Sequence, residues 1–413
     1  MKILHIITRL IVGGAQENTL LTCEGLHARG HDVTLLTGPS PGPEGSLMPR
    51  AQSAGYRVLI TPHLVRNPHP YHDYAAYRQI QRLIRDLNPD IVHTHSSKAG
   101  ILGRAAAWKT RSPGTPDGNP VLCPRSPITL PQVTHTIHGL PFHPYQNPLA
   151  RHLWIALERY AAQRCDHIIS VADAMTRQAR AAGIAAHRGN DFFTTIYSAM
   201  DTQPFLNSPT TRQEIRQRLH IPPTAFVFGT LARLQPLKGH DDLLAHAATL
   251  FAQVPDAHLL WIGDGIFRPR FEKALAEMLG PNWQSKVTLT GLVPPTEIPS
   301  LLPAMDVLVH PSYREGLARA LPQALLAAVP VISYDCDGAA EVCLEGQTGH
   351  LVPTGNAPAL AAAMIKIAQD RPLARQMGLA GRALCTQKFD AQLMVQKIES
   401  LYNRLLNRIQ QMP

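Results

Sequence analysis

The sequence predicts an α/β protein built from two doubly wound parallel sheets. Three observations lead to this fold class. Short β-branched runs alternate with longer amphipathic runs, the alternation starts afresh once near the middle of the chain, and the 413 residues exceed what one hydrophobic core usually organises. We therefore expect two consecutive Rossmann-like domains, with ligands bound beyond the carboxyl ends of their strands and, by default, in a cleft between the domains.

The first half of the chain alternates between strand-like and helix-like segments. In order, it reads KILHIIT, AQENTLLTCEGLHARG, HDVTLLTG, a helix-like segment near 74–87, DIVHTHSS, QVTHTIHG, a helix around 147–164, and DHIISVAD. The alternation pauses at residues 110–131, which are dense in Pro, Gly and Ser. We expect a surface excursion there.

The opening segment MKILHIITRLIV briefly resembles a secretory signal peptide. His5 and Arg9 interrupt it, however, and no small-residue cleavage site precedes GGAQENTL. We interpret it as a buried first strand. Apolar runs stay shorter than the roughly 18 residues of a membrane span, so membrane contact is expected to be peripheral.

The pattern restarts after TTIYSAMDTQPFLNSPT. The second half reads AFVFGTLARL, a helix from about 240, HLLWIGDG, KVTLTGLV, DVLVHPS, PVISYD and GHLVP. We place the domains at residues 1–205 and 206–390. Helical periodicity in MVQKIESLYNRLLNRIQ predicts a C-terminal helix within residues 391–413.

Charge and cysteine content narrow the class of protein. Lys plus Arg exceed Asp plus Glu by 39 to 30, and a net charge of +9 suits an anionic ligand, an acidic membrane surface or nucleic acid. Aromatic residues make up only 6%, and no nucleic-acid recognition module is visible. The six cysteines, Cys123 among them, form no CxxC pair, so we expect neither disulfides nor a structural metal, and a reducing cytoplasm fits best.

Three strand ends in the first half carry candidate residues. Gly13 and Gly14 either let the backbone approach a ligand or form a tight turn before a helix. His138 ends a strand and precedes a glycine, where it could polarise a hydroxyl or position a sugar. His135 is expected to be packed. Ser96 and its neighbours are explained by a simple helix cap.

Two cations follow the first strand of the second half. Arg233 and Lys238 lie five residues apart, ahead of a helix. They could clamp a diphosphate and stabilise the negative charge that builds when it leaves, a role otherwise given to a metal. Taken alone, the two cations are better explained as part of a solvated basic loop.

The stretch YREGLARALPQALLAAVPVISYD places Glu315 in a loop and Gln323 eight residues later. Glu315 could bind sugar hydroxyls, while the amides of Gly316, Leu317 and Ala318 face an anion at the positive end of a helix. Pro322 is tolerated only in a first turn, so the helix should begin near residue 320. The alternative is that Glu315 caps or pairs locally and Gln323 lies at the surface.

Two acidic turns could suggest a metal. Asp335 and Asp337 resemble an Asp-x-Asp motif, and Asp264 lies in the turn GDG. Because Asp and Gly are ordinary turn residues after strands, we expect no metal site at either place.

These segments together resemble the family 4 glycosyltransferases, retaining enzymes of the GT-B fold that move a sugar from a nucleotide donor. The resemblance spans nearly the whole chain, and the order and spacing of its motifs carry it: GGAQENTL, THSSKAGILGR, HTIHG, a shortened IYSAMD, GTLARLQPLKG, IGDG, VTLTGLV, SYREGLARALPQAL with PVIS, and GQTGHLVP.

The resemblance implies a role for each candidate residue. Arg233 and Lys238 would bind the donor diphosphate, which reverses the solvated-loop interpretation. His138 would line the donor-sugar site, and Glu315 would contact the sugar. The remaining donor-binding positions would be Gly13, Gly14, Leu292, Val293, Gly316, Leu317, Ala318 and Gln323.

Gln323 departs from the family pattern, which has a second glutamate binding the nucleotide ribose. An amide offers one acceptor and one donor pair, so ribose binding should persist but weaken. The loss of a charge-assisted hydrogen bond corresponds to about 1 kcal/mol, or five- to tenfold in affinity.

The resemblance implies a metal-independent hexosyltransferase with no cofactor beyond a UDP- or GDP-linked sugar as co-substrate. The first domain would bind a glycan or lipid-linked acceptor in cell-envelope, lipopolysaccharide or exopolysaccharide synthesis, and the C-terminal helix would fold back onto it. Arg104, Lys109, Arg111 and Arg125 suit peripheral contact with anionic lipids at the inner membrane face of the cytoplasm.

Two other classes are weighed against this reading. A non-hydrolysing sugar-nucleotide epimerase of the same fold would need no acceptor, but it should show paired acids and a histidine rather than the REGLARALPQAL pattern. A basic nucleic-acid-binding protein would explain the net charge but lacks a recognition module, so no nucleic-acid partner is expected.

Overall fold

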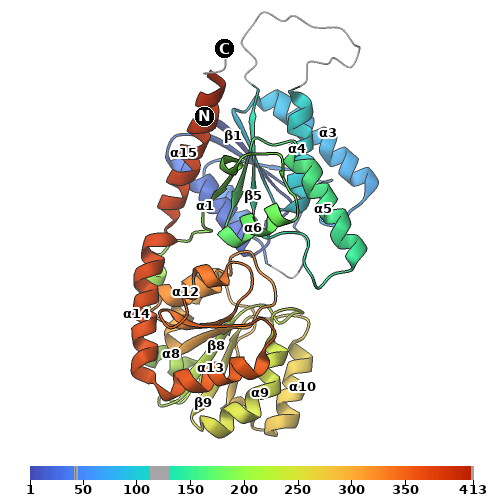
Figure 1. Ribbon diagram of the computed structural model, residues 1–413. Helices are drawn as coiled ribbons and strands as arrows, with labels where there is room; N and C mark the ends of the chain where they lie inside the picture. The colour runs from blue at the N-terminus through green and yellow to red at the C-terminus, as the bar shows by residue number, and fades with distance from the viewer. Residues whose placement is uncertain (41, 43–44, 112–129, 411–413) are drawn as a thin grey trace, which may run out of the picture. The chain divides into compact units, whose positions relative to one another are not determined.

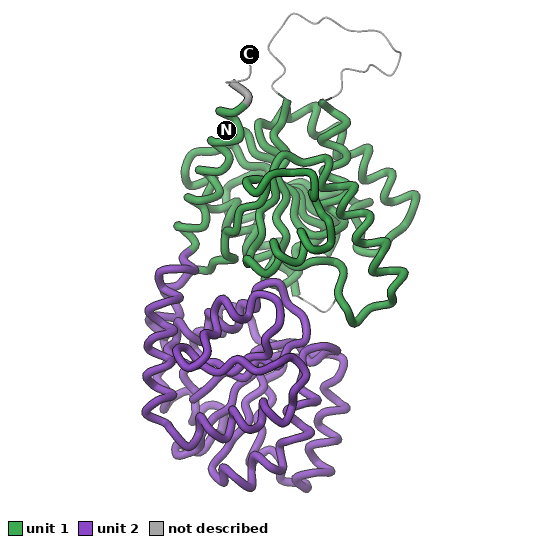
Figure 2. The backbone as a smooth tube through the Cα atoms, viewed as in Figure 1, with its two compact units in different colours: residues 1–200, 391–413 green, residues 201–390 purple. Residues whose placement is uncertain are grey.

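The computed structural model describes residues 1–410 except 41, 43, 44 and 112–129. The chain forms two compact units, residues 1–200 with 391–413 and residues 201–390 (Figure 2). The first boundary therefore lies at residue 200, where the sequence suggested 205. Most of the expected excursion at 110–131, together with Cys123 and Arg125, lies outside the described residues.

The first unit contains a seven-stranded parallel sheet of order β3-β2-β1-β4-β5-β6-β7 (Figure 1). Its strands are β1 Lys2–Ile7, β2 Asp32–Thr37, β3 Arg57–Ile60, β4 Ile91–His95, β5 Gln132–Ile137, β6 His167–Ser170 and β7 Phe193–Thr195. The opening apolar segment is thus the buried strand that the sequence predicts, at the centre of the β2-β1-β4 part of the sheet.

Helices connect the strands of this unit. They are α1 Gly14–Ala28, α2 Met48–Ser53, α3 Pro70–Leu87, α4 Ser97–Thr110, α5 Pro148–Ala162, α6 Asp173–Ala181 and the terminal α15 Ala391–Gln410. Helix α15 packs against α1, with Val395 and Leu401 in one hydrophobic cluster with Leu20. A Cβ on Gly25 would lie 2.5 Å from a methyl carbon of Val395, so the small residue lets the two helices approach closely.

The second unit contains a six-stranded parallel sheet of order β10-β9-β8-β11-β12-β13. Its strands are β8 Phe226–Leu231, β9 Ala257–Ile262, β10 Val287–Leu289, β11 Val307–His310, β12 Val331–Tyr334 and β13 Gly349–Val352. Strands β8, β11 and β12 are neighbours in the sheet, although helices and the two strands β9 and β10 separate β8 from β11 in the chain. The loops that follow these three strands therefore share one edge of the sheet.

The helices of the second unit are α7 Gln203–Leu206, α8 Arg212–Arg218, α9 His240–Gln253, α10 Arg268–Leu279, α11 Ile298–Leu301, α12 Ala320–Leu326, α13 Ala357–Gln369 and α14 Arg371–Lys388. Helix α12 begins at Ala320 and places Pro322 in its first turn, as the sequence predicts. Both sheets are entirely parallel, which confirms the predicted α/β class with two Rossmann-like units.

Two arginines that the sequence suggested for a basic surface of the first unit are instead buried or mostly buried. Arg104 is fully buried and paired with Glu158 at 2.7 Å, because it projects inward from α4. Arg111 is mostly buried and forms an ion pair with Asp166. The predicted basic surface therefore retains Lys109 as its exposed cation among the described members. No helix in the described ranges is long and apolar enough to cross a membrane.

Candidate active site

Lys238 and Glu315 meet at the carboxyl edge of the second sheet. Lys238 follows β8 and Glu315 follows β11, and these strands are paired in the sheet. The Lys238 ammonium donates a hydrogen bond to Glu315 Oε1. His310, the last residue of β11, places its Nε2 3.3 Å from the same oxygen. The sheet order thus brings Lys238 to the Glu315 carboxylate, and His310, from the strand that precedes Glu315, lies on the same oxygen.

Gly239 allows the two loops to touch. Its φ of +73° lies in the left-handed region, and a Cβ there would be only 1.9 Å from the carbonyl oxygen of Pro311. The amide of Tyr313 donates to the carbonyl of Leu237 at 2.9 Å, which joins the same loops. Glycine after Lys238 is therefore required for the lysine to reach the loop that carries Glu315.

The charges around Glu315 keep its carboxyl ionised. Burial alone would raise the pKa of Glu315, but Lys238 and His310 outweigh it and hold the pKa well below its usual range. The Glu315 side chain is 19% exposed and that of Lys238 is 20% exposed. The carboxylate is thus an acceptor-only group that remains partly open to a ligand hydroxyl.

The loop after β12 holds the Glu315 backbone. The amide of Glu315 donates to Asp337 Oδ2 at 2.6 Å, and the amide of Gly338 donates to the carbonyl of Gly316 at 3.0 Å. Asp337 has a φ of +51° and acts as a turn residue. Its carboxylate positions the main chain that carries Glu315.

Arg233 lies in the same β8 loop, and its side chain is exposed. No residue in the described part of the chain accepts a hydrogen bond from its guanidinium. Next to it, the amide of Leu234 donates to the carbonyl of Asp264 at 3.0 Å, which ties this loop to the turn after β9. The Asp264 carboxylate accepts a hydrogen bond from the amide of Gly265 at 2.7 Å, so this side chain stabilises the turn in which it lies. An anion can therefore approach Arg233 from solvent.

The segment at the end of β10 lies beside this turn. Gly263 and Gly291 form an antiparallel bridge. Leu292 follows directly with 58% exposure, and Val293 is half-buried. The positions predicted to contact a base thus lie next to the loops of β8 and β9.

The three residues after Glu315 were predicted at the start of a helix, but they lie in the loop before it. Gly316, Leu317 and Ala318 are buried and precede α12, whose first residue is Ala320. Their amides therefore belong to a loop and not to a helix end, because Pro322 delays the helix. Gln323 lies on α12, is half-buried, and has no hydrogen-bond partner for its side chain among the described residues.

The first unit has its own pocket at the carboxyl edge of its sheet. The cavity has a volume of about 250 Å³ and is lined by His138, Ser96, Ser97, Glu158 and Ala15, among others. His138 follows β5 directly and is half-buried. Ala15 comes from the first turn of α1, so this pocket gathers His138 with the start of the helix that follows the double glycine.

The structure describes the surroundings of Gly13 and His135, two residues of the first unit that the sequence singled out. Gly13 has a φ of 177°, an extended conformation open to any residue, and a Cβ there would meet only the flexible end of Gln16. The backbone conformation of Gly13 therefore does not by itself require glycine. His135 is buried and its Nδ1 lies 2.9 Å from Thr94 Oγ1, which confirms its packed role.

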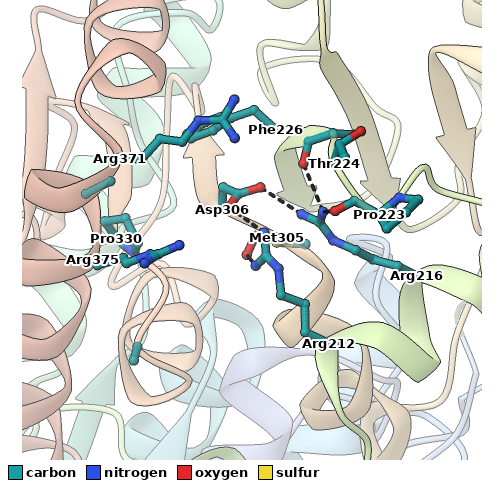
Figure 3. A pocket seen from close by; sticks show the side chains of 13 residues that line it. Arg212, Arg216, Pro223, Thr224, Phe226, Met305, Asp306, Pro330, Arg371 and Arg375 are labelled. Carbon is teal, nitrogen blue, oxygen red and sulfur yellow. Dashed lines mark hydrogen bonds and ion pairs between the residues drawn. The ribbon is translucent and has the colours of Figure 1, made fainter.

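A larger cavity of about 470 Å³ lies at the opposite, amino edge of the second sheet (Figure 3). It is rich in arginine, but Arg212 and Arg216 both bind Asp306, and Arg216 also donates to three main-chain carbonyls. Arg371 pairs with Asp256. These cations fix α8 and α14 to the ends of strands, and they lie away from Lys238 and Glu315.

His310 and Asp337 are the site residues that sequence reasoning missed. His310 lies at the end of the strand-like run in DVLVHPS, much as His138 does in QVTHTIHG, and this parallel could have identified His310 from the sequence. Asp337 was noted in the sequence only as part of an Asp-x-Asp motif in a turn, and its contact with Glu315 was not predicted. Its contact with Glu315 spans 22 residues and depends on the pairing of β11 with β12.

Comparison with known proteins identifies the family of the chain. The family model "Glycosyl transferases group 1" matches residues 211–384, and "Glycosyl transferase 4-like domain" matches residues 13–189.

One relative is the UDP-Gal:alpha-D-GlcNAc-diphosphoundecaprenol alpha-1,3-galactosyltransferase of Escherichia coli, which is 26% identical over 97% of this chain and 96% of its own length. Another is the GDP-mannose-dependent alpha-(1-6)-phosphatidylinositol monomannoside mannosyltransferase of Mycobacterium tuberculosis, 27% identical over 82% of this chain and 81% of its own. The crystal structure of Anabaena HepE in complex with UDP-glucose has a TM-score of 0.77 at 20% identity and covers 98% of this chain and 100% of its own.

Proposed function

The chain belongs to the GT4-type glycosyltransferases of the GT-B fold, and we propose that it transfers a hexose from a UDP-linked donor to a hydroxyl of a lipid-linked glycan, with retention of configuration and without a metal. The galactosyltransferase relative acts on a diphosphoundecaprenol-linked sugar, as its name says, and the solved neighbour holds UDP-glucose. These names support the donor and acceptor classes. We propose that the transfer is a step in the synthesis of a cell-envelope or exported polysaccharide.

The observation that carries the proposal is the Lys238, Glu315 and His310 group. The ionised Glu315 carboxylate accepts hydrogen bonds from donor-sugar hydroxyls. Lys238 beside it and the exposed Arg233 bind the diphosphate and stabilise its charge as it leaves. Leu292 and Val293 contact the base, and the loop amides of residues 316–318 contact phosphate and sugar. The second unit is thus the donor-binding unit and the first, with its pocket at His138, contacts the sugar and acceptor.

The bond changes of the proposed transfer balance without a side-chain base. The bond between the anomeric carbon and the β-phosphate oxygen breaks, and a bond to the acceptor oxygen forms on the same face of the sugar. The proton of the acceptor hydroxyl passes to the departing phosphate oxygen. The protein contributes positioning and fixed positive charge.

Thermal-shift measurements against UDP-, GDP- and ADP-sugars test the donor. A ligand that binds only the folded state raises its stability, so UDP-sugars should raise the melting temperature most. No shift across the panel would contradict the donor assignment. With a lipid-linked acceptor, NMR of the product should show the donor's anomeric configuration, and EDTA should leave the rate unchanged.

Epimerisation is distinguished in the same preparation. A sugar-nucleotide epimerase would convert UDP-N-acetylglucosamine alone into its epimer, whereas the proposed transferase requires an acceptor. Both relatives named above are transferases, which favours transfer.

Peripheral contact with anionic lipids at the inner membrane face is the remaining part of the proposal. The net charge of +9 and the exposed Lys109 support it, whereas the buried Arg104 does not. Binding to anionic liposomes at low salt, lost at high salt, is the expected result. Indifference to such liposomes would remove the membrane from the proposal.

A further inference from the structure

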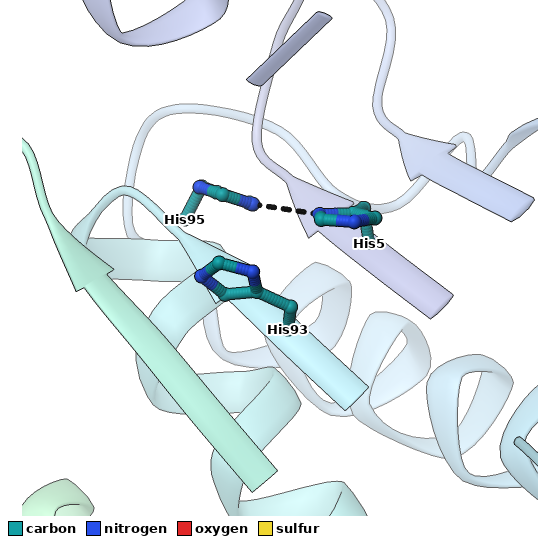
Figure 4. Close-up of side chains that lie close together, drawn as sticks. All are labelled: His5, His93 and His95. Atoms are coloured by element: carbon teal, nitrogen blue, oxygen red, sulfur yellow. Dashed lines mark hydrogen bonds between the residues drawn. The ribbon is translucent and has the colours of Figure 1, made fainter. Parts of the chain in front are cut away.

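Three histidine rings form a hydrogen-bonded row that ends at His138. His5 Nδ1 lies 3.0 Å from His95 Nε2, and His95 Nδ1 lies 3.0 Å from His138 Nε2. The His5 and His95 rings are close to parallel, and Figure 4 shows the bond between them. His5 comes from β1, His95 from the end of β4 and His138 from just after β5, so three adjacent strands build the row.

The imidazole rings of His5 and His95 are neutral. His5 is fully buried, and burial lowers its pKa to about 3. Burial, reinforced by His93, also holds the pKa of His95 well below its usual range. Each ring therefore carries one N–H, so one of its nitrogens donates and the other accepts.

The far end of the row sets its direction. His5 Nε2 is buried and has no hydrogen-bond partner among the described residues. A buried N–H without a partner is rarer and more costly than a buried lone pair without one. The His5 proton therefore belongs on Nδ1, which donates to His95 Nε2. His95 must then carry its proton on Nδ1 and donate to His138 Nε2.

His93 completes a cluster that could suggest a metal site, because potential ligand atoms of His5, His93 and His95 lie within 4.8 Å of one another. The donor set does not fit one. His93 Nδ1 lies 2.5 Å from the hydroxyl of Tyr402, and its Nε2 lies 2.7 Å from Thr136 Oγ1, so both nitrogens are already engaged. The His93 ring instead packs against His95, with ring centres 4.2 Å apart.

We propose that His95 and His5 are positioning residues that hold the His138 ring with its proton on Nδ1. His138 then serves as a hydrogen-bond donor to an oxygen of the sugar or phosphate bound in the 250 Å³ pocket that it lines. The substrate part rests on the proposed function, whereas the tautomer does not. A neutral donor at this place suits a hydroxyl or phosphate oxygen and adds no net charge.

Nitrogen-15 NMR of histidine-labelled protein tests the tautomer directly. In the unaltered protein, the His138 signals, assigned by their loss in His138→Ala, should show a protonated Nδ1 and an unprotonated Nε2. In His95→Leu the donor to Nε2 is gone, and the proton should shift toward Nε2. A protonated His138 Nε2 in the unaltered protein would overturn the proposal, whether or not any sugar is transferred.

Kinetics test the positioning role. His95→Leu should lower kcat/KM by roughly tenfold, the effect of one lost hydrogen bond. His95→Asn keeps an amide donor near the Nδ1 position and should recover much of that loss. In a His138→Ala background, His95→Leu should have little further effect, because it acts through His138. Equal losses in both backgrounds would mean a merely structural role and overturn the proposal.

His167 provides the matched control. It is a buried histidine on β6 of the same sheet, and its Nε2 lies 2.9 Å from Thr194 Oγ1, outside the row. His167→Leu should leave both the His138 spectrum and kcat/KM near their unaltered values. A change in the His138 tautomer in this variant would show that the ring responds to general disturbance of the sheet and would contradict the role of His95.

Discussion

Lys238 donates a hydrogen bond to Glu315, and the two residues are 77 positions apart in the chain. The sequence predicts that Lys238 contacts the diphosphate of the donor and that Glu315 contacts its sugar. Their direct contact means that each sets the electrostatic environment of the other. A substitution at either position should therefore alter both parts of the donor site.

Lys238→Met should reduce the rate of transfer by about 10²- to 10³-fold, because it removes a preorganised positive charge from the leaving diphosphate. Lys238→Arg should retain part of the rate because it keeps the charge. Initial rates with saturating donor and acceptor measure the effect. Lys273→Met, which changes an exposed lysine of α10, is the control, and a similar loss in that variant would contradict the assignment.

Glu315 should make a contribution to stability that depends on pH. Its folded-state pKa lies below the ordinary glutamate value near 4.5, so the contribution is fully present above about pH 4.5 and is lost as pH falls toward the folded pKa. The difference in unfolding free energy between the unaltered protein and Glu315→Gln should shrink from pH 7 to pH 3. Urea denaturation at both pH values measures it, and a difference that grows toward acid would contradict the role of Lys238 and His310.

Gly239→Ala should destabilise the protein more than a left-handed conformation alone explains. Backbone strain at a positive φ corresponds to about 1–2 kcal/mol, and here the new Cβ would also meet the carbonyl of Pro311. Gly346→Ala is a control in the same unit, since Gly346 has a φ of +71° but no atom within 4 Å of a Cβ. Equal losses in denaturant midpoints would show that loop contact adds nothing.

Gln323→Glu should tighten UDP-sugar binding about five- to tenfold if this side chain faces the ribose, because a carboxylate accepts from both ribose hydroxyls. Its amide has no other partner among the described residues, so the change disrupts no existing bond. Calorimetric titration measures the affinity. Unchanged affinity would place Gln323 outside the donor site.

Arg104→Met should destabilise the first unit by about 3–5 kcal/mol, because Glu158 would remain buried without its partner. Arg104→Met combined with Glu158→Met should recover most of the loss, since no uncompensated charge then remains. Thermal and denaturant unfolding compare the single and double variants. A small effect of the single variant would show that the pair lies closer to solvent than its burial indicates.

The local sequence was sufficient to predict an element wherever the residues of that element alone determine its structure. Pro322 predicts the start of α12 at residue 320, and the apolar opening segment predicts β1. Arg104 shows where this reasoning stopped. A charge within a helix does not by itself reveal which side faces the core, because that depends on Glu158, 54 residues further along the chain. Residues 316–318 lie in the loop before α12 and not in its first turn, and this difference is local, because Pro322 sets the start of the helix at Ala320.

The sequence by itself determined the α/β class, the two Rossmann-like units, the family and the strand ends that carry Lys238, Glu315 and His138. Only the tertiary structure decided which of these side chains meet. Strand pairing placed β8 beside β11 and β1 beside β4, which brought Lys238 to Glu315 and His5 to His95. The physical reason is that periodicity and propensity act over a few residues, whereas sheet order brings together residues that are distant in the chain.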